Sequence, residues 1–218
     1  TGTLLGLTML FWVLGVKETE SLGEGAFIVS LTVVVVPIVN RVFFASKLSI
    51  NSVMALVPAV VGLFLLSLKM NSLGEYIFEL DSTHIYFLVS TLGFAFHVIL
   101  TSRYAQSIPF MSLSAVQLAA IASVAIIAAG VSESWPEKIS TTSWFWVVCS
   151  ALIATSLRFG LQTKAMAHLK PSHSSMVFML EPVWTSLLGI LLLGESMLVN
   201  QLWGCVLIFC SLLVYRLT

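Results

Sequence analysis

Charged residues are scarce in this chain. Only 9% of its 218 residues are Asp, Glu, Lys or Arg, whereas an average soluble domain has about 25%. Hydrophobic residues make up 58% of the chain, and the mean hydropathy is +1.03. A soluble core of this size could not hide so much apolar surface. The composition therefore excludes an ordinary soluble domain and predicts an integral membrane protein.

Several functional signatures are also missing. The net charge is zero and no basic run occurs, which argues against nucleic acid as a partner. There is no HExxH zinc motif and no GxSxG nucleophile motif, and Asp81 is the only aspartate, so an intramembrane aspartyl dyad is excluded. The three cysteines, Cys149, Cys205 and Cys210, lie in apolar segments, unlike a disulfide framework or a metal site. We therefore expect no enzymatic activity, no cofactor and no metal.

Long apolar segments dominate what is present. A membrane-spanning helix needs about 20 mostly apolar residues, and eight segments satisfy this requirement to a greater or lesser degree. They are Gly2–Val16, Ala26–Phe44, Ile50–Leu68, His84–Thr101, Phe110–Val131, Ser143–Thr163, Ser172–Leu193 and Gln201–Leu217. Only the loop Lys69–Thr83 is long enough to separate two halves. The sequence therefore predicts an all-α, multi-pass membrane protein with eight visible spans.

Basic residues are divided unevenly between the two ends of these spans. With an even number of spans, both visible termini face the same side of the membrane. That side holds Arg41, Lys47, Arg103, Lys164, Lys170 and Arg216, while the opposite side holds Lys17, Lys69 and Lys138. By the positive-inside rule we expect both visible termini in the cytoplasm, with the protein in the plasma (inner) membrane.

The chain also contains an internal repeat. At an offset of 149 residues, Gly25–Leu66 lies over Ser174–Tyr215 without a gap. Both copies share a small-residue start, a mid-helix proline and a polar connector of equal length, and duplication of this kind is a recurrent transporter plan. On this reading, residues 1–70 hold the last three helices of a first repeat, and residues 83–218 hold a complete second repeat of five helices. We then expect two further helices ahead of Thr1, in a parent of ten.

Short motifs in the second half resemble those of a known family. They are Glu181-Pro182, Gly194-Glu195 and the run Asn200-Gln201-Leu202-Trp203-Gly204, and AFIVSLTVVVVPIV in the first half is similar to the same region of that family. The chain thus resembles the EamA-type permeases of the drug/metabolite transporter superfamily. This resemblance implies two inverted five-helix repeats and alternating-access transport of small metabolites. One departure is Ala45-Ser46, where the second repeat has Gly194-Glu195.

Glu181 is the first candidate site residue. Between His173 and Glu195 no other side chain can ionise, and a carboxylate at membrane depth costs several kcal/mol unless it is paired, protonated or facing a water-filled cavity. Trp184 and Thr185 follow at i+3 and i+4 and share its helix face. One interpretation is a site that binds a cation or a proton and is lined by the indole. The other is a neutral, hydrogen-bonded glutamic acid in a helix bent by Pro182.

Arg158 is the second candidate, with Thr155 and Gln162 on the same helix face. At 1.5 Å per residue, Arg158 is about 9 Å from Lys164 and Glu181 is about 14 Å from Ser172, so their depths differ by about 5 Å. An Arg158–Glu181 ion pair is therefore predicted if the two helices adjoin. The alternative is that Arg158 extends to the cytoplasmic interface.

His97 and Gln117 complete the candidate substrate-binding set. His97 could relay a proton or contact a ligand, although we favour a packed, hydrogen-bonded histidine. Gln117 could line the pore, although an uncharged amide that holds neighbouring helices together is the better interpretation.

Taken together, these features predict a secondary-active transporter of a small polar metabolite, amino-acid-like or another small organic solute. The expected partners are the substrate, the lipid bilayer and a coupling proton at Glu181, and no pattern specifies an oligomeric state. The alternative is a non-transporting, multi-pass scaffold or assembly protein.

Overall fold

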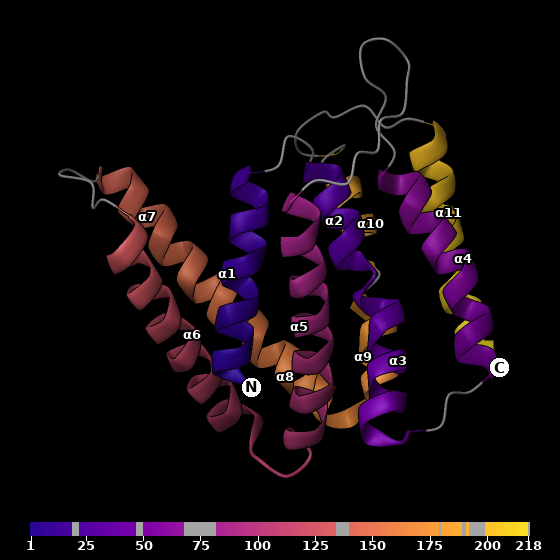
Figure 1. Ribbon diagram of the computed structural model, residues 1–218, viewed down its shortest axis with the longest axis horizontal. Coiled ribbons are helices and arrows are strands. Elements are labelled where there is room, and N and C mark those ends of the chain that lie inside the picture. The colour runs from indigo at the N-terminus through magenta and orange to yellow at the C-terminus, as the bar shows by residue number, and fades with distance from the viewer. Residues whose placement is uncertain are drawn as a thin grey trace.

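The computed structural model describes residues 1–18, 22–46, 50–67, 82–133, 140–178, 180–188, 191 and 199–217. All regular elements within these ranges are helices, so the prediction of an all-α protein is confirmed (Figure 1). The elements are α1 (Gly2–Glu18), α2 (Leu22–Ser30), α3 (Thr32–Phe44), α4 (Ile50–Ser67), α5 (Ser82–Tyr104), α6 (Phe110–Ser132), α7 (Thr141–Cys149), the π-helix η1 (Ser150–Leu157), α8 (Arg158–His168), α9 (Pro171–Phe178), α10 (Leu180–Leu188) and α11 (Val199–Leu217).

Three helices in the described residues are long and apolar enough to cross a membrane. They are Thr83–Tyr104 with 22 residues, Phe110–Ser132 with 23, and Thr141–His168 with 28, the last formed by α7, η1 and α8. Shorter apolar helices cover Ile28–Phe44, Val53–Leu65 and Leu202–Ser211. A membrane protein is therefore supported, while the count of eight spans stays a prediction. Most of the predicted loop Lys69–Thr83 and the Gly194-Glu195 motif lie outside the described residues.

The predicted segment Ala26–Phe44 is broken into two helices. α2 ends at Ser30, and α3 begins at Thr32 and contains Pro37. Proline lacks a backbone N–H and disturbs the preceding turn, and nearby hydroxyls accompany the break. The Ser30 hydroxyl donates to the Ala26 carbonyl (2.8 Å), and the Thr32 hydroxyl donates to the Val29 carbonyl (2.6 Å). Such back-bonding offers the carbonyls an alternative partner and bends helices.

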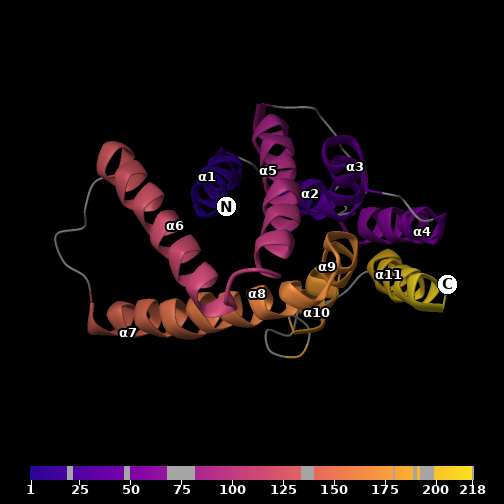
Figure 2. The ribbon, with the colours of Figure 1, turned by 90° about the horizontal axis from the view of Figure 1, so that it is seen from below.

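α5 is the helix around which most of the others assemble. It packs against α1, α2, α3, α8 and α9, while α1 also packs on α6 and α6 on α8 (Figures 1 and 2). Two hydroxyls of α5 donate hydrogen bonds to the backbones of neighbouring helices. Ser90 Oγ donates to the Thr8 carbonyl (3.3 Å), and Thr91 Oγ1 donates to the Ile28 carbonyl (3.0 Å). Small residues and interhelical hydroxyl bonds are the usual adhesive between helices in lipid.

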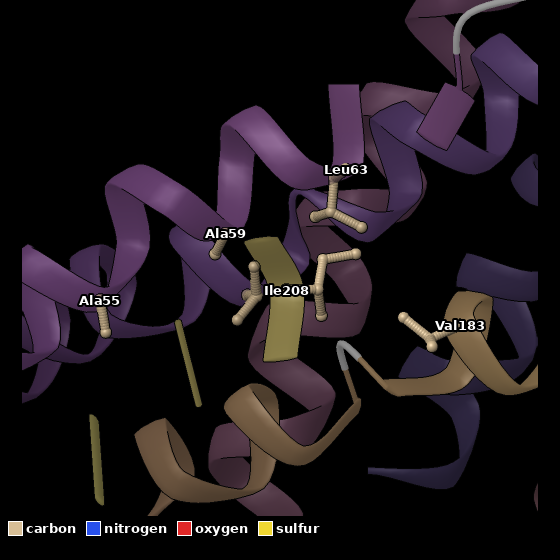
Figure 3. Packing of buried hydrophobic residues seen from close by; sticks show 6 residues of the cluster. Ala55, Ala59, Leu63, Val183 and Ile208 are labelled. Carbon is tan, nitrogen blue, oxygen red and sulfur yellow. The ribbon is translucent and has the colours of Figure 1, made fainter. Parts of the chain in front are cut away.

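α4 and α11 form a second, closely packed unit. The Asn200 amide at the start of α11 donates to the Leu65 carbonyl near the end of α4 (3.2 Å), so the two helices run antiparallel. Between them lies an apolar cluster that also includes residues of α3 and α10 (Figure 3). Its buried members are Val33, Ala55, Ala59, Leu63, Val183 and Ile208.

We expect Gly62→Ala to destabilise the protein. An alanine Cβ at Gly62 would lie 2.7 Å from the Gly204 carbonyl oxygen, and backbone on both sides cannot yield easily. The free energy of unfolding should fall by roughly 1–3 kcal/mol, measured by thermal denaturation in detergent. Gly130→Ala is the matched control, since nothing lies within 4 Å of its added Cβ and alanine favours the helix by up to about 1 kcal/mol. Equal stability of the two variants would contradict the close α4–α11 contact.

Candidate functional site

The structure brings Arg158 and Glu181 together. Arg158 is the first residue of α8, Glu181 lies in the first turn of α10, and α9 between them packs against both helices (Figure 2). The Arg158 Nη2 atom is 3.9 Å from the Glu181 Oε1 atom, and the two side chains are 57% and 66% exposed. The sequence predicts this ion pair only if the two helices adjoin, and α8 does contact the α9–α10 segment.

Both charges line a groove of about 460 Å³ between η1–α8 and α9–α10. Its walls are mostly aliphatic and aromatic, and Gln162 and Ser174 are its other polar residues. The remaining lining residues are Ile153, Leu157, Leu161, Ala165, Met166, Leu169, Val177 and Phe178. The groove therefore offers one positive and one negative group beside an apolar wall.

Two other candidates stand apart from this groove. Trp184 is 53% exposed and Thr155 is exposed within η1, and neither is among the described lining residues. The side chain of Thr185 lies outside the described part of the chain. Of the three such residues whose side chains are described, Thr155, Gln162 and Trp184, only Gln162 reaches the groove.

His97 and Gln117 lie in a separate, buried network. Gln117 Nε2 donates to Thr101 Oγ1 (2.9 Å) and to Thr1 Oγ1 (3.0 Å), and the Thr101 hydroxyl lies 3.4 Å from His97 Nδ1. The His97 ring packs beside Phe159, at 6.3 Å between centroids. None of these residues lines the groove, so the network is separate from it.

The π-helical stretch before Arg158 has no counterpart in the sequence-based prediction. The Arg158 amide donates to the Ile153 carbonyl, five residues back, and the Ser156 hydroxyl donates to the Ala151 carbonyl, also five residues back (2.8 Å). No proline or glycine in Ser150–Leu157 signals this change. π-turns inside α-helices are rare and often lie at functional sites, and this one leads directly into Arg158.

Metal-binding geometry is not found in the described part of the chain. No group of three or more His, Cys, Asp or Glu side chains lies close enough there to hold a metal ion. The polar groups that line the groove are the Arg158–Glu181 pair, the Gln162 amide and the Ser174 hydroxyl.

These features define an all-helical membrane protein with an ion pair in an apolar groove, and comparison with known proteins places it in a family. The EamA-like transporter family matches residues 81–217, so the chain belongs to the EamA-like transporter family. An uncharacterized transporter of Archaeoglobus fulgidus is 23% identical over 226 residues, which cover 97% of this chain and 75% of that protein. A solved crystal structure has the same fold, with a TM-score of 0.81 at 15% identity, over 99% of this chain and 75% of its own.

A double-mutant cycle tests whether Arg158 and Glu181 interact. We expect Arg158→Ala to lower stability more than Arg158→Ala combined with Glu181→Gln, because the single change removes the positive charge beside the Glu181 carboxylate. The coupling energy should be about 0.5–1 kcal/mol for a pair this exposed, measured by thermal unfolding in detergent. Lys164→Ala combined with Glu181→Gln serves as the control cycle and should be additive. Additive losses for Arg158 and Glu181 as well would argue against the pair.

Proposed function

We propose that the protein is a secondary-active carrier that moves a small polar metabolite by alternating access, with Arg158 and Glu181 at its substrate-binding centre. The observation that carries this proposal is the placement of two opposite charges 3.9 Å apart in a groove with mostly apolar walls. A guanidinium binds a carboxylate or phosphate, and a carboxylate binds an amine. Together they favour an amino-acid-like zwitterion whose apolar part rests on the groove wall.

The spacing of the pair suits exchange with a substrate. Its 3.9 Å separation is longer than the roughly 2.8 Å of a direct charge-assisted hydrogen bond. A substrate carboxylate can therefore take the place of Glu181 beside Arg158, and a substrate ammonium the place of Arg158 beside Glu181. Each exchange keeps every charge paired, which a low-dielectric site requires.

The carrier plan that we propose includes an inverted repeat. Moved by the offset of 149 residues, α2 falls on 171–179, α3 on 181–193 and α4 on 199–216. These ranges lie close to the bounds of α9, α10 and α11. The antiparallel packing of α4 and α11 is the relation expected for repeats inverted about an axis in the membrane plane. The family match over residues 81–217 supports the division into residues 1–70 and 83–218.

The same repeat suggests what encloses the charge pair. In the first half, α5 contacts three residues. Its Gly93 lies against Thr8, its Phe87 lies against Gly25, and its Thr91 hydroxyl donates to the Ile28 carbonyl. At the repeat offset, their counterparts in the second half are Leu157, Ser174 and Val177. All three counterparts line the groove beside the ion pair. We therefore propose that a helix equivalent to α5 covers this groove in a ten-helix arrangement, which would place Arg158 and Glu181 inside the bundle.

Substrate flux into proteoliposomes tests the role of Glu181. A metabolite panel is first screened by thermal shift, and the flux of each stabilising compound is then compared for the full-length protein and for Glu181→Gln. We expect the substitution to reduce flux at least tenfold, which corresponds to about 1.4 kcal/mol, because the ammonium loses its counter-charge. If Glu181 also carries the coupling proton, the pH dependence of flux should disappear with it.

Glu133→Gln provides the matched control, since Glu133 is an exposed carboxylate at the end of α6. Its flux and pH dependence should equal those of the unmodified protein. Unchanged flux in Glu181→Gln would remove Glu181 from the mechanism. Absence of flux for every compound in the unmodified protein would favour a non-transporting scaffold instead.

A further inference from the structure

A cluster of contacts joins α3 and α5 at the end of the bundle where both helices finish. The Arg103 Nη2 atom donates to Asn40 Oδ1 (3.3 Å), and the Arg103 guanidinium lies 4.1 Å from the centroid of the Phe44 ring. Asn40 is only 7% exposed, so Arg103 is the charged partner of a nearly buried amide oxygen. We call Arg103, Asn40 and Phe44 the Arg103 latch.

Apolar packing continues directly beneath the latch. Phe43 of α3 meets Phe96 of α5 edge to face, with 5.2 Å between ring centroids. Further in, side chains of α3, α5 and α8 form a closed core, with Phe44, Phe96 and Phe178 packed against it. The buried members of this core are Val36, Val39, Ala95, Val98, Ile99 and Met166. We call this core the apolar seal. It joins helices of the two proposed repeats, and the latch lies next to it.

The two repeats meet unequally at their two ends. α3 packs on α9 near the latch. At the offset of 149 residues, α3 corresponds to α10 and α9 to α2, so the equivalent contact would join α10 and α2. Among the described residues, α2 and α10 share no comparable contact. In the part of the chain that the structure describes, the two proposed repeats are thus joined more tightly at the latch end than at the other.

We propose that the Arg103 latch closes this end of the carrier and that its release opens the same end during transport, an inference that rests on the proposed function. Arg103 is exposed, so its head group can leave Asn40 and Phe44 for water or lipid head groups without a large desolvation cost. A hydrogen bond from a charged group and an exposed cation–π contact bias such an equilibrium but do not lock it. The α2–α10 contact would form when the latch opens.

Cysteine labelling tests the latch in the full-length protein. Cys149, Cys205 and Cys210 are first replaced by alanine, and Val39→Cys then places a thiol in the apolar seal, where Val39 is 5% exposed. In substrate-free nanodiscs, we expect Arg103→Ala to raise the rate of labelling by a water-soluble maleimide about tenfold, corresponding to about 1.4 kcal/mol. Arg103→Lys should give an intermediate rate, because the ammonium lacks the planar contact with Phe44.

Arg41→Ala is the matched control, since Arg41 is an exposed arginine in the last turn of the same α3. Labelling in that variant should match the parent, and a thiol at Ala59→Cys in the α4–α11 cluster should label equally in all variants. Equal rates at Val39→Cys with and without Arg103, or an equal rise at Ala59→Cys, would overturn the latch. Because no substrate is used, a flat labelling result leaves the Glu181 flux test standing, and failure of the flux test leaves the labelling result standing.

Discussion

The contact between α4 and α11 forms the apolar cluster on which α3 and α10 also pack. Helices in lipid gain little from apolar burial against one another, so close backbone approach and interhelical hydrogen bonds must supply the attraction. Gly62 allows that approach because only a hydrogen faces the Gly204 carbonyl, and Asn200 bonds across the pair. Val33 of α3 and Val183 of α10 pack on the same cluster. α10, which carries Glu181, is therefore packed in part against this interface.

The ion pair is the electrostatic consequence of that arrangement. A lone carboxylate or guanidinium at membrane depth is expensive, and removal of one member of a pair leaves the other uncompensated. Arg158 and Glu181 come from helices separated by the α8–α9 connection, yet the fold holds their charged atoms 3.9 Å apart. The proposed preference for a zwitterion rests on charge balance, because a ligand that carries both charges can pair with both residues.

Hydropathy is sufficient to predict the helical class and the approximate place of most helices, because apolar length is set by the bilayer. The family resemblance rests on short motifs such as Glu181-Pro182. The Arg158–Glu181 proximity was also predictable, since helix rise is constant and depth can be counted along the chain. The sequence is less informative about which neighbouring helix each side chain faces. His97 and Gln117 point into a network with Thr101, and which face meets which neighbour depends on packing that a single apolar segment does not encode. The Asn40–Arg103 bond has no sequence signal because it joins two different helices. The π-turn before Arg158 has no sequence signal either, and its residues are all exposed.

The internal repeat gives a physical reason why one chain of this kind could hold two conformations of similar free energy. If α2 and α3 correspond to α9 and α10, a contact between α3 and α9 can be exchanged for one between α2 and α10 with similar apolar surfaces on both sides. A small difference between two such states is what a modest bias can shift. The latch at Arg103 is of that kind, since it consists of one hydrogen bond and one ring contact at an exposed position. In the proposed carrier, substrate binding between Arg158 and Glu181 would act on the segment formed by α8, α9 and α10, and α9 of this segment packs on α3. Binding there would then shift the same balance.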